Sequence, residues 1–275
     1  MKRKIIFTML MFLFSGGVAV SAWKIYQELR EYEEGTDTYV GLTQYIEMPD
    51  GPEEEPDKEL GKSGPEPDEG LAEAGRKEES VEGTSRFPTV DFAALKSINP
   101  DIVGWVYIEG TAINYPIVQG TDNQYYLDHL FDGNYNSSGC IFLERQNAAD
   151  FSDQNSIIYG HHMKNGSMFA SLKNYKSQEY YENHPTAILL TPKESCRVKL
   201  FAGYVSDVEE GAWKIDFGTQ ESFKAWLEGV KKRSWFSSEI TPAATSRVLT
   251  LSTCSYEFEN AKFVLYGEIV QEVEN

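Results

Sequence analysis

Three residues that together can carry out acyl transfer stand at the ends of apolar, strand-like runs in this chain of 275 residues. Cys254 ends the alternating run RVLTLSTC, His161 follows the run IIYG, and Lys262 opens the run KFVLYG. A thiol becomes a strong nucleophile when a nearby cation favours the thiolate, and an imidazole can then protonate a leaving amine. A lysine can stabilise the oxyanion that forms in between. If the strands end at one rim of a sheet, the pattern predicts Cys254 as nucleophile, His161 as acid and base, and Lys262 as the cation.

His162 and the order of the residues along the chain limit which kinds of catalytic site are possible. His162 directly follows His161, and because adjacent residues of an extended strand face opposite ways, at most one of the two is expected to point into the site. The sequence has no CxxC, HExxH or comparable ligand spacing, so we predict neither a metal site nor a cofactor. In papain-like hydrolases the cysteine precedes the histidine, whereas here the order is reversed.

The other two cysteines are interpreted as structural. Three cysteines, an odd number, leave at least one thiol free or bonded to another molecule in an exported chain. Cys140 and Cys196 lie in apolar, strand-like runs, and free cysteines in such places are commonly buried as small hydrophobic residues. A disulfide is the alternative.

From about Phe87 the composition is that of a globular domain, and its pattern predicts a mainly β fold. A short helix is expected in DFAALKSINPD, and a long one after Thr219, which can cap its start. The apolar stripe of the long helix should dock on a sheet. Many short runs separated by turn-forming residues favour a closed eight-stranded β-barrel. Its strands are expected at residues 103–108, 112–118, 139–143, 156–160, 187–191, 196–206, 247–253 and 262–270.

The N-terminal segment has the features of a membrane anchor. Lys2 to Lys4 are all basic, and the run from Ile5 to Trp23 contains no charged residue and is about long enough to cross a bilayer. Positive charge in front of the run favours a cytoplasmic N-terminus, with the rest of the chain outside the cell. We therefore predict a retained single-pass anchor over residues 1–30. A signal peptide cleaved after Val20-Ser21-Ala22 is the alternative.

The formal net charge of −18 is concentrated in the segment that follows. Residues 31–82 hold 18 acidic and 4 basic residues, and residues 48–85 combine Pro, Gly and charge with few apolar side chains. Such a stretch cannot bury enough apolar surface to offset the entropy of ordering. We predict an acidic, disordered spacer over residues 31–86 and a catalytic domain over residues 87–275. The acidity argues against nucleic acid as a partner.

Three stretches of the sequence carry a resemblance to a known family. They are TLSTC followed by a charged residue that opens an apolar strand, IIYGHHM upstream, and LKSINPDIVGWVYIEGTAINYPIVQGTDNQYYLDH near the start of the domain. Together they resemble the sortases, the cysteine transpeptidases of Gram-positive cell surfaces, and most closely class B. A long helix before the cysteine strand is also a feature of that class. The resemblance covers roughly residues 88–272 and implies a sortase-like barrel. It also implies that Cys254 is the nucleophile, His161 the catalytic histidine and His162 its non-catalytic neighbour.

The chain departs from the family at the third catalytic residue. The family has an arginine at the start of the last strand, where this sequence reads AKFV with Lys262. Lysine keeps the charge but lacks the planar fork that can hold two oxygen atoms at once. Either Lys262 suffices, or another cation such as Arg145 or Arg247 takes the place of the arginine.

Similarity to class B further implies a substrate groove and partners. The groove residues are Asn123, Leu127, Tyr159 and Ser252. The implied reaction cleaves a C-terminal sorting motif of a surface protein after its threonine and transfers the acyl group to an amine of a peptidoglycan precursor, with membrane lipid around the N-terminal helix. The alternatives are a pilin-polymerising sortase, which differs only in the second substrate, and a non-catalytic surface binding module whose thiol is incidental.

Overall fold

The computed structural model describes residues 2–49, 87–207, 211–255, 257 and 260–271. Its helices are α1 (Lys2–Leu42), η1 (Thr43–Tyr45), α2 (Phe92–Ile98), η2 (Tyr125–Leu127), η3 (Ala170–Lys176), α3 (Gln178–Asn183) and α4 (Gln220–Arg233). Its strands are β1 (Ile46–Glu47), β2 (Thr89–Val90), β3 (Ile102–Tyr107), β4 (Asn114–Val118), β5 (Ile141–Leu143), β6 (Asn155–Tyr159), β7 (Thr186–Leu190), β8 (Ser195–Ser206), β9 (Arg247–Cys254) and β10 (Lys262–Gln271).

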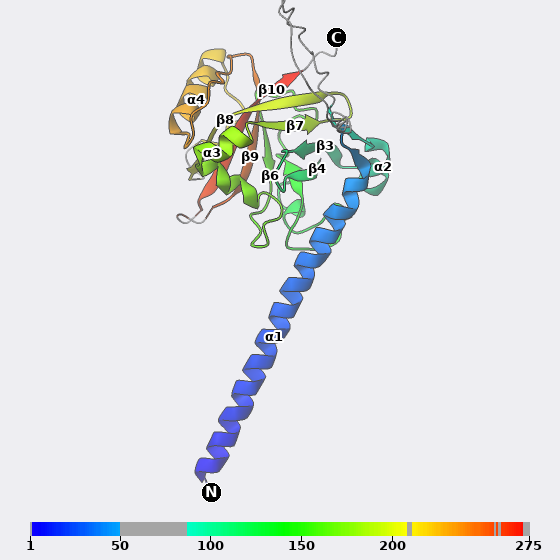
Figure 1. The fold of residues 1–275 in the computed structure, drawn as a ribbon, viewed down its shortest axis with the longest axis vertical. Coiled ribbons are helices and arrows are strands. Elements are labelled where there is room, and N and C mark those ends of the chain that lie inside the picture. Colours follow the sequence, from blue (N-terminus) through cyan, green and yellow to red (C-terminus); the bar gives the residue numbers. More distant parts are fainter. Residues whose placement is uncertain (1, 50–86, 208–210, 256, 258–259, 272–275) are drawn as a thin grey trace, which may run out of the picture.

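Strands β3 to β10 close into one barrel, which confirms the predicted fold class (Figure 1). Around the barrel they follow the order β10-β8-β7-β3-β4-β5-β6-β9. The β4–β5 and β6–β9 pairs are parallel, and the other pairs are antiparallel. Each predicted strand is present within about two residues of its expected bounds. The parallel β6–β9 pair has the most direct consequence for function, because it sets the end of one strand beside the end of another far along the chain.

Alternation along the strands separates two apolar cores. Leu249 and Leu251 of β9 point into the barrel and belong to its core, whereas the intervening side chains point outward. Val248 belongs instead to a second core outside the barrel, together with Phe223 and Leu227 of α4. The outward row of β9 ends with the cysteine, so the predicted site lies on the outer surface of the barrel wall rather than in its interior.

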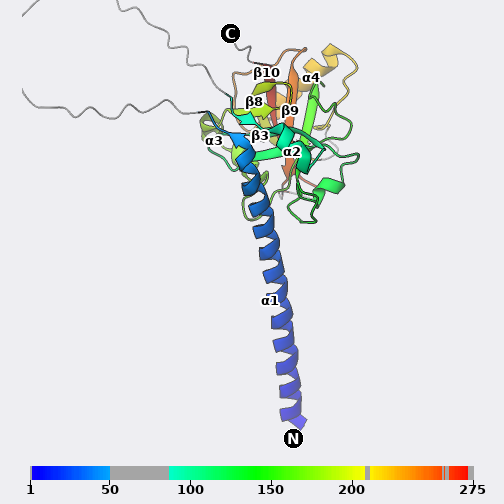
Figure 2. The same cartoon turned by 90° about the vertical axis from the view of Figure 1, so that its right-hand side faces the viewer.

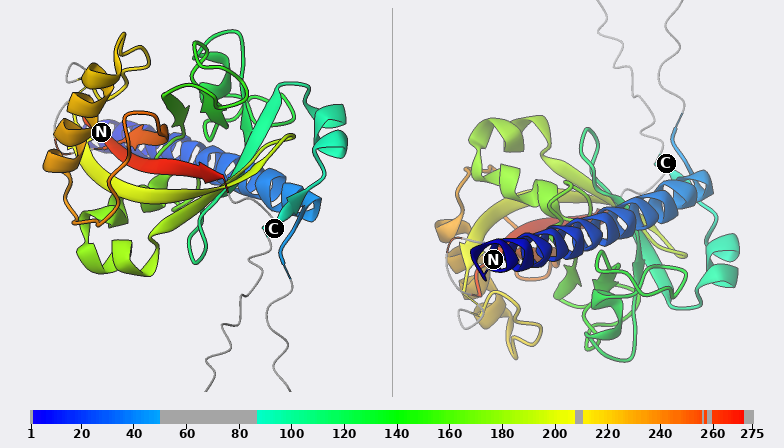
Figure 3. Two further views of the ribbon diagram at one scale, coloured as in Figure 1. Left: turned by 90° about the horizontal axis from the view of Figure 1, so that it is seen from above. Right: turned by 90° about the horizontal axis from the view of Figure 1, so that it is seen from below.

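Helix α4 covers this outer face, as the apolar stripe of its sequence predicts. The Thr219 hydroxyl accepts a hydrogen bond of 3.1 Å from the backbone N–H of Ser222, which caps the first turn. Phe223, Leu227 and Val230 are buried at helical spacing. Figure 3 shows α4 on one flank of the barrel and α2 on the other. This outer layer stabilises the barrel on the side where the outward row of β9 lies.

Helix α1 extends further than the sequence analysis predicts, and its C-terminal part packs on the barrel. We expected the helical anchor to end near residue 30, but the helix continues without a break to Leu42 (Figures 1 and 2). Gly35, Tyr39 and Leu42 are buried and recur at the three- and four-residue spacing of one helix face. The described start of the predicted spacer, residues 31–49, is therefore ordered, because its few apolar residues share one face. The acidic composition of the whole segment concealed that face.

Two short strands join the ends of the remaining part of the predicted spacer. β1 pairs antiparallel with β2, and Ile46 stands opposite Val90. Residues 50–86 lie between these strands and outside the described residues, so their predicted disorder stays a prediction. Because the flanking strands already lie side by side, a short turn can connect them.

Replacing residues 50–86 with a short Gly-Ser loop is therefore expected to leave the fold intact, since these residues have too few apolar side chains to join a core. The midpoint of thermal unfolding, measured by near-ultraviolet circular dichroism on the full chain in detergent, should change by no more than a few degrees. A large fall in that midpoint would mean that the segment packs against the barrel.

Candidate active site

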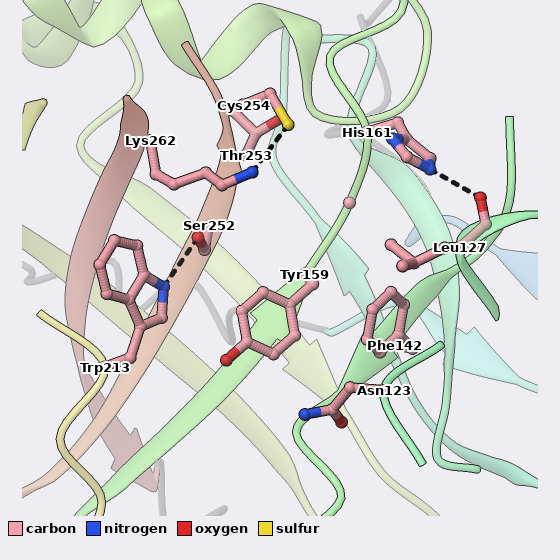
Figure 4. A pocket seen from close by; sticks show the side chains of 11 residues that line it. Asn123, Leu127, Phe142, Tyr159, His161, Trp213, Ser252, Thr253, Cys254 and Lys262 are labelled. Carbon is pink, nitrogen blue, oxygen red and sulfur yellow. Dashed lines mark hydrogen bonds between the residues drawn. The ribbon is translucent and has the colours of Figure 1, made fainter. Parts of the chain in front are cut away.

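The pairing of β9 with β10 brings Lys262 to Cys254. The last residue of β9 and the first residue of β10 are direct partners in the antiparallel register. The side chains of direct partners lie on the same face of the sheet, with Cβ atoms about 5 Å apart. The Lys262 Nζ atom donates a hydrogen bond of 3.0 Å to the Cys254 Sγ atom (Figure 4). Both side chains are partly buried, so solvent screens this contact only in part.

The parallel register of β6 with β9 brings His161 to the same rim. Tyr159 stands opposite Ser252, and the Gly160 N–H donates a hydrogen bond of 3.1 Å to the Ser252 carbonyl. His161, the residue after Gly160, therefore lies close to the end of β9, where Cys254 stands. A Cβ atom at Gly160 would come within 2.3 Å of the Ile141 side chain, so only glycine fits before the histidine.

The His161 ring is oriented by a backbone carbonyl. Its Nε2 atom lies 2.6 Å from the Leu127 carbonyl oxygen, which can only accept a hydrogen bond. In the neutral ring the proton is therefore on Nε2, and the lone pair is on Nδ1. Figure 4 shows His161 across the upper rim from Cys254, with its Nε2 side turned to Leu127. The remaining nitrogen, Nδ1, is the atom free to take up and return a proton.

The neighbouring His162 contacts the cysteine through the backbone. Its Nδ1 atom lies 3.1 Å from the Cys254 carbonyl oxygen and donates a hydrogen bond to it. His161 lines the cavity, and His162 is not among the lining residues. The two rings thus differ in orientation as adjacent strand-end residues should, and His162 holds the end of β9 in place.

A cavity of about 390 Å³ opens beside these residues. All seven residues predicted for the site line it, together with four residues that the sequence analysis did not identify. The predicted seven are Asn123, Leu127, Tyr159, His161, Ser252, Cys254 and Lys262, and the additional four are Phe142, Gly160, Trp213 and Thr253. The structure therefore brings together every predicted site residue, although their assigned roles stay predictions.

Trp213 is the most informative of the residues that were missed. Its indole Nε1–H donates a hydrogen bond of 2.9 Å to the Ser252 hydroxyl, as drawn in Figure 4. It follows β8 in the chain and lies next to the outer core under α4. A tryptophan in the polar segment EEGAWKIDF has no periodic pattern around it, so no sequence signal could place it in the cavity.

A buried carboxylate supports the other side of the cavity. Glu144 is 7% exposed, and its Oε2 atom accepts hydrogen bonds from Asn123 Nδ2 at 2.6 Å and from the Tyr159 hydroxyl at 3.1 Å. Its other oxygen accepts one from the Gln146 N–H at 3.2 Å. Burial, and then the charge and hydrogen bond of Glu144, raise the pKa of Tyr159, so the phenol stays protonated and donates. Glu144 thereby fixes which way the Asn123 amide and the Tyr159 hydroxyl point.

The three cysteines fall into two classes, and all are free thiols. Burial raises the pKa of the Cys140 thiol to about 12 and that of the Cys196 thiol to about 11. Both are fully buried, which confirms their interpretation as small apolar residues and contradicts the disulfide alternative. Cys254 is partly exposed beside a cation, so it is the thiol suited to nucleophilic attack.

Arg247, one of the alternative cations, is too far from the site. It is the first residue of β9, whereas Cys254 is the last, which separates their Cα atoms by roughly 23 Å. Its Nη1 atom donates to the Glu194 carboxylate at 2.8 Å at the opposite rim of the barrel. Arg145 is exposed, and no side chain of the described cavity lining is an arginine. Among the described residues, Lys262 is the cation that contacts the thiol.

Comparison with known proteins identifies the family. The family model described as the sortase domain matches residues 106–270. The chain is 36% identical over 178 residues to sortase B of Listeria monocytogenes, an alignment covering 64% of this chain and 72% of that protein. The sortase B–substrate complex of Staphylococcus aureus superposes with a TM-score of 0.63 at 30% identity, covering 66% of this chain and 84% of that one. Sortase B of Clostridium perfringens gives a TM-score of 0.62 at 33% identity and covers 65% and 99%. The chain belongs to the class B sortases.

As a member of this family, the protein is a cysteine transpeptidase. The binding-module alternative, in which the thiol is incidental, loses its support. The matched region begins in β3 and ends in β10, so it contains the whole of the cavity lining but excludes α1. The contacts between α1 and the barrel are therefore a feature of this sortase that the family model does not describe.

Replacing Glu144 with Gln is expected to weaken substrate binding more than turnover. The amide can present its oxygen to Asn123 and Tyr159 or to the Gln146 N–H, but not to both sides. A hydrogen bond to a charged group is worth about 1.5–3 kcal/mol, so KM for a cleavable peptide should rise roughly tenfold or more while kcat changes little.

Exposed Glu109 provides the matched control, because its replacement with Gln makes the same chemical change away from the cavity. Steady-state kinetics and thermal unfolding on both variants are the measurements. A lower unfolding midpoint in Glu144→Gln with unchanged KM would show that this carboxylate acts only on stability.

Proposed function

We propose that this sortase is a membrane-anchored transpeptidase that cleaves a C-terminal sorting motif after its threonine and transfers the acyl group to an amine. The observation that carries the proposal is the 3.0 Å contact between Lys262 Nζ and Cys254 Sγ in a cavity that His161 also lines. An ammonium group at this distance can stabilise the negative charge of a thiolate, the form of cysteine that attacks a carbonyl. Lys262 thus takes the place of the arginine expected from the family.

In the first half-reaction the Cys254 thiolate attacks the carbonyl carbon of the threonine. The carbonyl π-electrons move to the oxygen, and the ammonium group of Lys262, which carries two further N–H donors, stabilises the resulting oxyanion. The protonated His161 ring donates its Nδ1 proton to the departing amine as the C–N bond breaks. The product is a thioester between the threonine and the cysteine, with the C-terminal peptide released.

In the second half-reaction an acceptor amine attacks the thioester carbonyl. His161 Nδ1 takes the proton that the amine loses, and the thiolate of Cys254 leaves as the new amide bond forms. The hydrogen bond from Nε2 to the Leu127 carbonyl keeps the ring in one orientation through both steps. We propose a peptidoglycan precursor as the source of the amine. A pilin lysine is the alternative, since it differs only in what carries the amine.

The proposed location is the outer surface of the cell membrane. Among the described residues, α1 is the one helix long and apolar enough to cross a bilayer, and none of its apolar window is buried against the protein. Phe7, Phe12 and Phe14 are among its exposed apolar side chains, a pattern that lipid accounts for. Basic residues at the start of the helix favour a cytoplasmic N-terminus.

Mass spectrometry of the acyl-enzyme trapped from a library of threonine-containing peptides identifies the sorting motif.

Replacement of Lys262 tests the proposed role of its charge. Lys262→Met keeps the length of the side chain but removes the charge, so kcat/KM for peptide cleavage should fall by roughly 10²–10³-fold, the scale for loss of one oxyanion donor. Lys262→Arg should retain activity or raise it, since the guanidinium adds a second donor in a fixed plane. The measurement is peptide cleavage followed by chromatography.

Two controls accompany this series. Cys254→Ala should abolish cleavage, whereas Cys140→Ala should not, because the Cys140 thiol is buried and protonated. Circular dichroism confirms folding in each variant. Activity like that of the parent in Lys262→Met would remove this residue from the mechanism, and turnover in Cys254→Ala would overturn the proposed function itself.

Separate replacement of the two adjacent histidines tests the acid–base assignment. His161→Ala should lower kcat/KM by about 10²–10⁴-fold, the usual contribution of a general acid and base. His162→Ala removes one hydrogen bond to the Cys254 carbonyl, which is worth about 0.5–1.5 kcal/mol, so the loss should stay near or below tenfold. His184, bonded to Tyr180 and outside the cavity lining, is the control. Equal losses in His161→Ala and His162→Ala would mean that the assignment between them is wrong.

A further inference from the structure

We infer that the part of α1 beyond the apolar run, residues 24–42, is a rigid stalk that holds the active-site rim at a fixed, short height above the membrane. The stalk then sets the height above the bilayer at which a membrane-held substrate must present its cleavage site. This inference rests on the proposed membrane anchoring and peptide cleavage. It adds a geometric restriction on substrates that neither of those requires.

The first support is that α1 docks on the barrel through a built contact surface. The Tyr39 hydroxyl donates to the Gly139 carbonyl at 2.5 Å, and its ring packs edge-on against Tyr115 of β4 at 5.2 Å between centroids. Gly35 is buried, and a Cβ atom there would lie 2.8 Å from the Ser138 hydroxyl. The helix can approach the barrel this closely only because residue 35 has no side chain. A flexible tether would need none of these contacts.

The second support is the position of those contacts relative to the active site. The Asn136 side chain donates to the Glu31 carbonyl at 2.8 Å, and Lys164 lies 3.8 Å from the Glu28 carboxylate. Asn136 belongs to the segment that follows Leu127, and Lys164 to the segment that follows the histidines. The segments that continue from two lining residues, Leu127 and His161, therefore both contact the lower part of the stalk.

The stalk is short below these contacts. Glu28 is five residues beyond Trp23, the last residue of the apolar run, which corresponds to about 7 Å along a helix. Leu42, which leads into η1 and its contacts with α2, lies roughly 20 Å higher on the same axis. In Figure 1, β10 ends at the top of the domain, far from the N-terminus of α1, so the start of this strand is at the lower side. Lys262 is the first residue of β10. The active-site rim is thus the side of the barrel nearest the bilayer.

A fixed height has a consequence that can be measured. When two partners are tethered to one surface, the effective concentration is greatest where the tether length matches the distance to be spanned, and it falls for shorter or much longer tethers. The sortase should therefore prefer a vesicle-anchored peptide whose cleavage site stands at one particular height. Free peptide in solution has no such dependence.

The experiment uses the full-length sortase reconstituted in phospholipid vesicles. The probe is the peptide that the parent cleaves best from a threonine-containing library, attached to a lipid through oligoproline spacers, which extend about 3.1 Å per residue. In the parent, turnover should peak at a spacer of a few prolines. Insertion of seven alanines after Lys24, where every neighbouring side chain is exposed, lengthens the stalk by two turns or about 10 Å. The optimum should then move to a spacer about three prolines longer.

A pair of glycine replacements tests rigidity separately from length. Gly35→Leu places a side chain against Ser138 and should push the lower part of the stalk away from the barrel while Tyr39 and Leu42 stay packed, which flattens the dependence on spacer length. Gly41→Leu makes the same change on an open face of the helix, where no atom lies within 4 Å, and should behave like the parent. Cleavage of the free peptide should stay within about twofold of the parent in all variants, since none alters the cavity lining.

Each outcome of these experiments supports the rigid stalk, overturns it, or overturns the proposed function. An optimum that moves with the inserted alanines and flattens in Gly35→Leu supports the rigid stalk. A parent with no optimum, or an optimum that stays where it is after the insertion, overturns it while leaving peptide cleavage intact. Failure of the parent to cleave any free peptide would instead overturn the proposed function, and the stalk inference with it.

Discussion

The backbone pairing of the end of β9 with the start of β10 is the constraint on which the rest of the site depends. Because Cys254 and Lys262 are direct partners, their contact needs no loop to position it. A shift of one residue in this register would send one of the two side chains to the barrel interior. The barrel core, which anchors Leu249 and Leu251 inward, therefore also protects the register of the site. Stability and chemistry are coupled through the same strand.

Lysine at position 262 can do less to orient a substrate than the arginine expected there. A guanidinium can bind two oxygen atoms in one plane, whereas an ammonium is a compact point charge on a flexible stem. Here the stem starts opposite the thiol, and the contact at 3.0 Å needs only a single donor. Substrate orientation must then come from elsewhere, and the Glu144 carboxylate, which holds Asn123 and Tyr159, supplies fixed polar groups on the far wall of the cavity.

Much of the barrel and the site could be predicted from the sequence, because strands alternate visibly and Cys254 and His161 each stand where such a run stops. The docked part of α1 could not, since Gly35 and Tyr39 lie in a segment whose overall composition is acidic and polar. Glu144 was missed for a related reason. A single glutamate after the apolar triplet of β5 has the pattern of a solvated strand end, and only the tertiary structure shows that it is 7% exposed. Composition describes averages over a segment, whereas packing is decided by the few residues on one face.

The burial of Tyr39, Leu42 and Ile46 in the barrel core changes what counts as the folding unit of this sortase. A fragment that begins at Phe87 would present Tyr115 and the carbonyl of Gly139 to water, with a vacant slot where an aromatic ring belongs. The core of the barrel is thus discontinuous in sequence, because it includes the end of the helix and the residues after it as well as the barrel strands. Natural recombination or laboratory design that grafts the barrel alone onto another anchor would leave behind part of its core.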